Sequence, residues 1–212
     1  MNLAVKTLPV RRSHAERTAL SDARMLDAAV SLIVTRGAAG TTLKEVGELA
    51  GYSRGLASVR FGNKAALFAF IVRSVGEEWL ATLREAVRDQ VGLPAILSAT
   101  DAHYCFVRDG AERIRAFYSL WFDSIGPDAD FKLTIANVHE RRQRDIEAWI
   151  RSGIAQGTVP SEVPVNAVAQ QFCAAIIGIV YQWLVRPEAT DHLQDLHIGL
   201  KQQMTLALSA KA

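Results

Sequence analysis

The stretch TLKEVGELAGYSRGLASVRFGNK, residues 42–64, decides the fold that we expect, because short helical segments alternate there with turn residues. Thr42, with Glu45 three residues later, is typical of a capping box, in which the threonine hydroxyl accepts the Glu45 backbone N–H. In this motif the glutamate carboxylate also reaches back to the Thr42 backbone N–H. We therefore predict a helix that begins at Leu43 and ends at Gly51, which tolerates left-handed backbone geometry.

Two further helix starts lie in the same stretch. Ser53 is a candidate cap for a short helix from Arg54 to about Phe61, and Asn63 is a candidate cap for a longer helix from Lys64. Two short helices joined by a glycine-containing turn, the second with basic side chains, are typical of a helix-turn-helix. The second helix of such a motif enters the major groove, so the stretch predicts binding to double-stranded DNA.

A longer segment, GTTLKEVGELAGYSRGLASVRFGNKAALF at residues 40–68, resembles the DNA-binding module of the TetR family of bacterial transcriptional repressors. The positions that fall on the family pattern without a gap are Thr42, Val46, Gly51, Ser53, Arg54, Gly55, Phe61, Asn63, Lys64 and Leu67. The resemblance implies a homodimer of about nine helices per chain, and a repressor that a small-molecule effector releases from its operator.

The segment departs from the family pattern at a few positions. Gly47 replaces the usual alanine, Ala57 and Ser58 replace a Leu-Tyr pair, and Arg60 stands where His or Tyr is common. In the resembled family the tyrosine of that pair contacts a phosphate. We therefore expect the DNA contacts near Ser58 and Arg60 to be this protein's own.

The candidate DNA-contacting residues are assigned from side-chain chemistry and from the resembled motif. Arg54 and Arg60 are candidates for guanine contacts, because a guanidinium can bridge guanine O6 and N7. The other candidates, mostly for phosphates, are Thr42, Lys44, Tyr52, Gly55, Ser58 and Lys64. For Tyr52, packing within the domain is an alternative role. A dimer reads two half-sites, so we expect a near-palindromic operator.

Charge is distributed unevenly along the chain. Residues 1–64 hold ten Lys/Arg and five Asp/Glu, a net charge of +5, whereas the remaining residues have a net charge of −3. A basic face alone is often only a solvated surface. Together with the helix-turn-helix, this asymmetry supplies the attraction to phosphates that DNA binding requires.

Composition indicates a compact protein of the cytoplasm. At 212 residues with 50% hydrophobic residues, the chain can bury roughly 70% of its unfolded surface. Cys105 and Cys173 are the only cysteines and form no CxxC motif, which favours a reducing compartment. The first residues lack an uninterrupted apolar segment, and the apolar run at 172–185 is shorter than about 18 residues, so we expect neither export nor a membrane partner.

Helical periodicity divides the chain into three parts. Residues 1–19 are expected to be a flexible basic arm, with disorder without function as the alternative, and residues 20–66 to be the helix-turn-helix domain. Residues 67–212 are expected to be the effector-sensing and dimerisation domain. The predicted helices are 21–36, 43–51, 54–61, 64–91, 95–108, 111–125, 128–156, 164–185 and 189–208, which is an all-α fold.

The last two predicted helices carry the expected dimer interface. Residues 172–184 are apolar around nearly the whole helix, which indicates burial on two sides. A four-helix interface between two copies satisfies this pattern, and a purely intramolecular core helix is the alternative. The candidate interface residues are Ile176, Ile179, Val180, Trp183, Leu196, Leu200 and Met204.

Aromatic residues of the central helices are candidates for an effector pocket. Tyr104, Phe117, Trp121 and Phe172 lie on faces that we expect to point inward, although aromatic residues at helical spacing are also typical of a plain core. The basic cluster at 141–144 could meet an acidic ligand, but interleaved acidic residues favour a solvated face.

Catalytic and metal-binding motifs are missing from the sequence. The five histidines have no metal-ligand spacing, and neither a GxSxG motif nor a phosphate-binding loop occurs. We therefore expect no cofactor, no metal and no enzymatic activity. The alternatives are an all-helical ligand-binding enzyme and a protein-interaction module that does not bind DNA.

Overall fold

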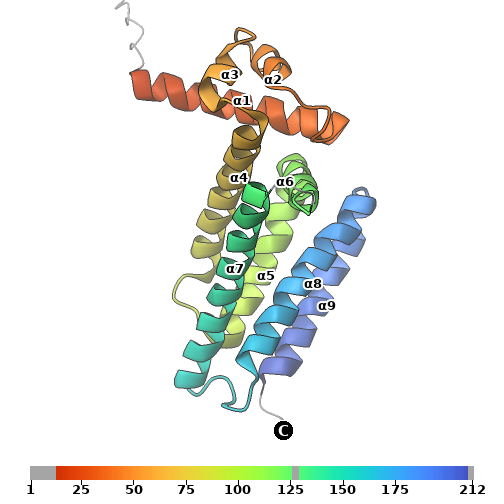
Figure 1. The fold of residues 1–212 in the computed structure, drawn as a ribbon. Coiled ribbons are helices and arrows are strands. Elements are labelled where there is room, and N and C mark those ends of the chain that lie inside the picture. The colour runs from red at the N-terminus through yellow and green to blue at the C-terminus, as the bar shows by residue number, and fades with distance from the viewer. Residues whose placement is uncertain (1–12, 126–128, 210–212) are drawn as a thin grey trace, which may run out of the picture. The chain divides into compact units, whose positions relative to one another are not determined.

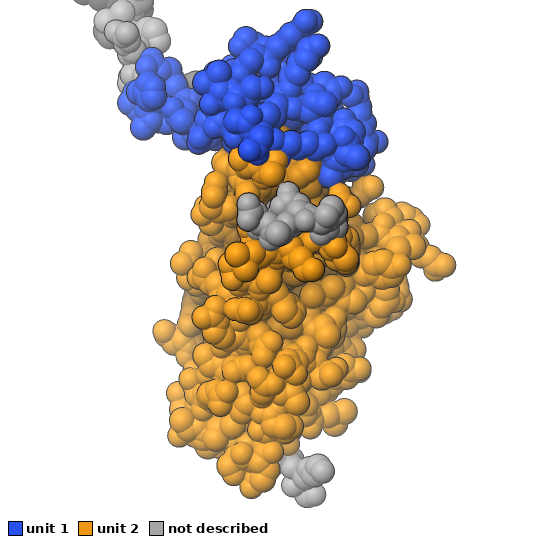
Figure 2. Space-filling view, in the orientation of Figure 1, with its two compact units in different colours: residues 1–64 blue, residues 65–212 orange. Residues whose placement is uncertain are grey.

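The computed structural model describes residues 13–125 and 129–209, which form nine α-helices and no strand (Figure 1). The helices are α1 His14–Arg36, α2 Leu43–Leu49, α3 Leu56–Phe61, α4 Lys64–Val87, α5 Gly92–Asp109, α6 Ala111–Asp123, α7 Ala129–Ala155, α8 Val165–Val185 and α9 Thr190–Leu208. The predicted all-α fold is confirmed. The chain divides into two compact units between Lys64 and Ala65 (Figure 2), close to the predicted boundary at 66.

The first helix begins earlier than the sequence analysis predicts. Ser13 caps α1: its hydroxyl accepts the Glu16 backbone N–H at 3.2 Å, and the Glu16 carboxylate accepts the Ser13 N–H at 2.6 Å. This capping box places residues 14–19 in a helix, so the expected flexible arm is wrong for that part. Residues 1–12 of the expected arm lie outside the described residues.

Unit 1 is a three-helix domain in which α1 packs on α2 and α2 packs on α3. Met25, Ala29 and Ile33 of α1 recur every four residues, and all three side chains are buried on one face. Val46 of α2 and Ala57 of α3 are also fully buried. This small apolar core holds the two short helices in place and leaves their polar side chains at the surface.

Unit 2 is a helical bundle in which α5 packs against α6, α7 and α9. The helix α8 packs on both α7 and α9, and Figure 1 shows α8 and α9 side by side. Fully buried apolar side chains from several helices form the core, among them Ile96, Leu120, Ile150 and Val180. Burying a side chain of this size stabilises a protein by about 1.5–3 kcal/mol, so this core is the main stabilising feature of the unit.

The helix α5 starts three residues before the predicted start at Ala95. Gly92 adopts φ +59° after the extended residue Val91, and Pro94 lies in the first turn, where its missing N–H removes no helical hydrogen bond. Gly92 also faces Gly153 of α7: a Cβ atom added to Gly153 would lie 2.7 Å from the Gly92 Cα. Two glycines therefore allow α5 and α7 to approach closely.

The predicted dimer residues occupy the core of a single chain. Ile176, Ile179, Val180 and Trp183 of α8 are buried, as are Leu200 and Met204 of α9, whereas Leu196 is half-buried. These six buried side chains already pack within one chain, which corrects the predicted interface. The large apolar side chains of α8 and α9 that are exposed are those of Tyr181, Val185, Ile198 and Leu206.

Candidate nucleic-acid interface and ligand cavity

The cap of α2 differs in part from the predicted capping box. The Thr42 hydroxyl lies 3.3 Å from the Glu45 backbone N–H, as predicted. The Glu45 carboxylate also accepts the Thr42 hydroxyl at 2.7 Å and pairs with Arg36 at 2.7 Å, and the predicted return bond from the Thr42 backbone N–H is the weakest of its interactions. Both partners lower the pKa of Glu45, with the Thr42 hydroxyl contributing most.

The start of α3 also differs from the prediction. Gly55 occupies the cap position without a side-chain hydrogen bond, and α3 begins at Leu56. Ser53 contributes its backbone carbonyl, which accepts the Leu56 N–H at 3.0 Å, and its hydroxyl does not cap the helix. The helix therefore starts two residues after the predicted start at Arg54, which precedes α3 and lies in the turn.

Arg60 makes the most specific polar contact of unit 1. Its Nε donates to Asp22 Oδ1 at 2.8 Å and its Nη2 donates to Asp22 Oδ2 at 2.7 Å, a two-pronged pair between α3 and α1. The carboxylate raises the pKa of Arg60. This arrangement braces α3 against α1, and it also occupies two of the guanidinium donors that a guanine contact would need.

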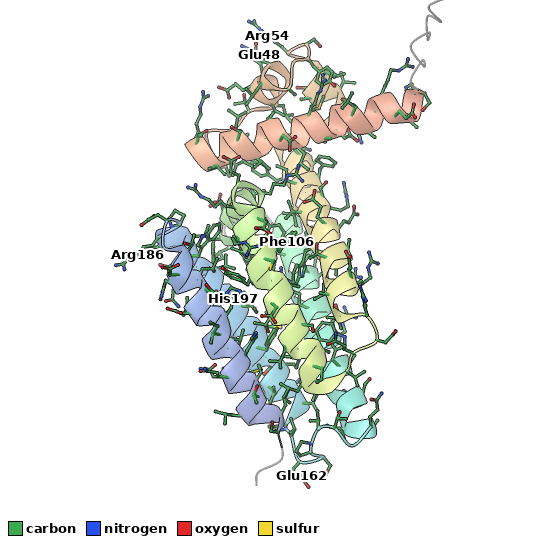
Figure 3. The ribbon with its side chains drawn as sticks, turned by 180° about the vertical axis from the view of Figure 1, so that it is seen from behind. Glu48, Arg54, Phe106, Glu162, Arg186 and His197 are labelled. Carbon is green, nitrogen blue, oxygen red and sulfur yellow. The ribbon has the colours of Figure 1, made fainter. Side chains whose placement is uncertain are left out.

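The remaining basic candidates lie around the two short helices. Arg54 is exposed and pairs with Glu48 of α2, and Figure 3 labels both residues. Lys64 donates to the Ala39 carbonyl at 2.9 Å, which ties the start of α4 to the loop before α2. Lys44 lies on the first turn of α2, where it is exposed to solvent. The structure therefore brings the basic residues together on one small domain.

The uncharged candidates divide between surface and interior. Ser58 and Gly55 are exposed, and Tyr52 is half-buried, with its backbone N–H donated to the Gly47 carbonyl at 2.9 Å. Sequence reasoning missed Val59, which is 84% exposed on α3. The signal in the sequence was its position between Ser58 and Arg60, both of which are candidate DNA contacts.

Gly47 has a steric reason to depart from the resembled pattern. A Cβ atom at this buried position would lie 2.9 Å from the Ser53 carbonyl oxygen, closer than real Cβ contacts come. The turn between α2 and α3 therefore passes nearer to α2 than an alanine would allow.

Unit 2 contains a cavity of about 480 Å³, lined by residues of α4, α5, α6, α7 and α8. Two of the four predicted pocket residues, Phe117 and Phe172, line it. Tyr104 and Trp121 do not line it, so the prediction is wrong for these two residues. The Tyr104 ring lies 5.5 Å from the His197 ring, and Trp121 packs against Phe117. Sequence reasoning missed the aromatic wall formed by Trp79 and Phe106.

The basic cluster at 141–144 supplies two cations, Arg141 and Arg142, to this cavity. The Arg142 guanidinium lies 5.1 Å from the centre of the Trp121 ring and 6.0 Å from that of Tyr118, and it donates to the Tyr118 hydroxyl at 3.3 Å. Arg142 lines the cavity, so a purely solvated face is wrong for this residue. Asp145 also lines it, and burial raises the pKa of that carboxyl.

Two buried histidines meet beside the cavity. Nδ1 of His103 on α5 lies 2.9 Å from Nε2 of His197 on α9, and Nδ1 of His197 lies 2.7 Å from the Leu193 carbonyl oxygen. Burial lowers the pKa of both rings, most strongly that of His103, where His197 and Arg142 add to the effect. The two residues are 94 positions apart, so spacing could not reveal the pair.

Comparison with known proteins agrees with this architecture. Residues 25–71 match the family model described as bacterial regulatory proteins of the tetR family. The chain is 26% identical over 198 residues to a probable HTH-type transcriptional regulator, ArpR of Pseudomonas putida, and 25% identical over 198 residues to the HTH-type transcriptional regulator TtgR of the same species. Each alignment covers 88% of this chain and 90% of the relative.

A solved structure shares the fold at lower sequence identity. A TetR-family transcriptional regulator from a Rhodococcus species superposes with a TM-score of 0.74 at 18% identity, covering 90% of this chain and 100% of the other. The order of helices in both units is therefore one that known bacterial regulators use.

Proposed function

We propose that this chain, a member of the TetR family of bacterial transcriptional regulators, represses transcription from a near-palindromic operator until a small molecule binds in unit 2. The observation that carries the proposal is the helix-turn-helix of α2 and α3, in the segment that matches the family model. Transcription regulation of this kind takes place in the cytoplasm, where the DNA lies.

In this proposal, exposed side chains of unit 1 contact the DNA. Arg54 and Arg60 read base edges, and Val59 is placed to pack on a thymine methyl group in the major groove. Thr42, Lys44, Tyr52, Ser58 and Lys64 contact phosphates or position the motif, with Gly55 shaping the turn. Arg60 reads guanine only if its ion pair with Asp22 breaks, or if its guanidinium contacts Asp22 and the base at the same time.

We propose that two copies associate through α8 and α9. The exposed apolar side chains Tyr181 and Val185 on α8, and Ile198 and Leu206 on α9, form the face that a second copy would cover. A two-fold dimer places two recognition helices about 34 Å apart, one helical turn of DNA, which doubles the number of base pairs read. The length and apolar character of α8 would also suit a membrane span, but eight of its side chains are buried in the bundle.

The cavity of unit 2 is the proposed effector site. Its aromatic walls and few polar groups are the combination that small-molecule sites use. An effector releases the operator only if it binds more tightly to the conformation that DNA binds less well. An enzyme or a module without DNA binding explains the cavity but not the family match of residues 25–71.

Selection of bound duplexes from a random pool, using the full chain, tests this proposal. We expect one recovered site made of two inverted half-sites, because a two-fold dimer presents the same helix twice. A pool without enriched sequence, at low salt as well as at physiological salt, would overturn the proposal.

A further inference from the structure

We propose that the ligand of the unit 2 cavity is a largely aromatic molecule with a hydroxyl group, which donates a hydrogen bond to His103 Nε2. This inference rests on the proposed function, since it names the chemistry of the proposed effector. It follows from a chain of three groups on two helices, and each step fixes where a proton must lie.

The first step assigns the proton on His197. Its Nδ1 lies 2.7 Å from the Leu193 carbonyl oxygen, which can only accept a hydrogen bond. Nδ1 of His197 is therefore the protonated nitrogen. Burial keeps this ring neutral, so its other nitrogen, Nε2, carries a lone pair and accepts.

The second step assigns the proton on His103. Its Nδ1 lies 2.9 Å from His197 Nε2, and because that nitrogen accepts, His103 Nδ1 must donate. The His103 side chain is only 4% exposed and lies near Arg142, both of which disfavour a second proton. Nε2 of His103 is therefore a lone-pair acceptor.

The third step places this acceptor in the cavity. His103 is a lining residue, and within residues 13–125 and 129–209 no donor forms a hydrogen bond to its Nε2. The Trp79 ring stands nearly perpendicular to the His103 ring at 5.5 Å, and Phe106 packs on Trp79 at 5.3 Å. The His103 ring thus lies against an aromatic wall of the cavity, and a ligand hydroxyl beside its Nε2 would satisfy this acceptor.

The walls of the cavity define the rest of the ligand. Trp79, Phe106, Phe117 and Phe172 offer flat apolar surfaces, and about 480 Å³ accommodates a molecule of two or more rings. The lining holds three guanidinium groups, of Arg73, Arg141 and Arg142, against the two carboxylates of Glu77 and Asp145, so its excess positive charge disfavours a cation. His103 and His197 belong to α5 and α9, and Figure 3 labels Phe106 and His197 on these two helices.

The test uses 4-phenylphenol and its methyl ether, 4-methoxybiphenyl, as matched probes of the full chain in isothermal titration calorimetry. A buried acceptor left without a donor costs about 1–3 kcal/mol, so we expect the phenol to bind roughly 5- to 150-fold more tightly than the ether. In His103→Phe, which keeps an aromatic ring but has no acceptor, the two affinities should become equal within about threefold.

The variant His197→Phe tests whether His197 fixes the proton on His103 Nδ1 or only packs against the His103 ring. It keeps a ring beside His103 but removes the acceptor for His103 Nδ1, so the proton of His103 can move to Nε2. We expect the preference for the phenol to fall in this variant although His103 is unchanged. A preference that stays at the wild-type value would show that His197 has only a packing role, and would overturn the relay.

Nitrogen-15 spectra of the histidine rings test the same assignment without a ligand and without a variant. We expect His103 and His197 of the wild-type chain each to carry a single proton on Nδ1 at pH 7. A proton on His103 Nε2 would overturn the inference. If neither biphenyl binds while the selected operator still binds, the ligand assignment fails and the proposed function stands.

Discussion

The two units of the molecule use polar side chains in opposite ways. In unit 1 the charged groups lie at the surface and pair with one another: Arg60 with Asp22, and Arg54 with Glu48. In unit 2 the histidines that we assign to ligand binding are buried, and among residues 13–125 and 129–209 His103 has one hydrogen-bond partner. Water and salt screen the first set more strongly than the two buried histidines.

This difference separates two kinds of recognition. Exposed charges attract any DNA, and their pairs can exchange a carboxylate for a phosphate or a base at small cost. Buried neutral groups discriminate between ligands, because a wrong ligand leaves a polar atom unsatisfied. We therefore expect changes in unit 2 to affect stability and ligand choice, and changes in unit 1 to affect DNA affinity and its salt dependence.

The largest effect is expected from the core of unit 2. Leu120 of α6 is fully buried, so Leu120→Ala should lower the free energy of unfolding by about 2–5 kcal/mol, measured by urea denaturation. The matched control is Leu133→Ala on α7, where the leucine is 60% exposed and the change should stay within about 0.5 kcal/mol. Equal losses of unfolding free energy in both variants would contradict the assignment of Leu120 to the core and Leu133 to the surface.

The next effect tests whether Arg60 reads DNA or only braces α3. If it reads guanine, Arg60→Ala should lose about 1–3 kcal/mol of discrimination at one base pair of each half-site, measured on single-substitution operator variants. Asp22→Asn should strengthen operator binding, because it removes the carboxylate that competes for the guanidinium. An unchanged specificity profile in Arg60→Ala, with the same loss of stability in both variants, would assign a purely structural role.

A smaller and uniform effect is expected at Lys44. Lys44→Ala should weaken binding to all DNA sequences alike and reduce the slope of log affinity against log salt by about 1. Lys132→Ala on α7 is the control, and its slope should match that of the wild type. A change in sequence preference in Lys44→Ala would move this residue from phosphate contacts to base contacts.

The pH dependence of Cys173 alkylation tests whether this thiol of unit 2 is buried. Burial raises the pKa of this thiol to about 11, and Cys173 lines the cavity. Because the thiolate is the reactive form, alkylation in a Cys105→Ser background should accelerate about tenfold per pH unit from 7 towards 11. Mass spectrometry measures the rate, and a plateau below pH 9 would contradict an enclosed thiol.

Local features of the fold could be predicted from the sequence. The helices α6 to α9 begin and end close to the predicted residues, because periodicity and helix-ending residues act within a few positions of the chain. The start of α1 could also have been predicted, since Ser13 and Glu16 form a capping box. The predicted start was too late because apolar periodicity becomes clear only later in that helix.

Features that depend on packing could not be predicted in the same way. The pairs Arg60–Asp22 and His103–His197 join residues 38 and 94 positions apart. A helix that is apolar on all sides, such as α8, does not indicate which apolar side the chain's own core uses, and this is why the predicted interface fell on Ile176 and Trp183. The prediction of Tyr104 and Trp121 as cavity residues was wrong for the same reason, because the sequence does not show which side chains of α5 and α6 line the cavity.

The most direct test of this account measures both affinities of the full chain over one salt series. Between about 50 and 200 mM salt, we expect affinity for the selected operator to fall by about 10³- to 10⁵-fold, while affinity for 4-phenylphenol changes less than about twofold. Operator binding that is insensitive to salt, or ligand binding that weakens in parallel with it, would contradict the division between an exposed charged surface and a largely apolar ligand site.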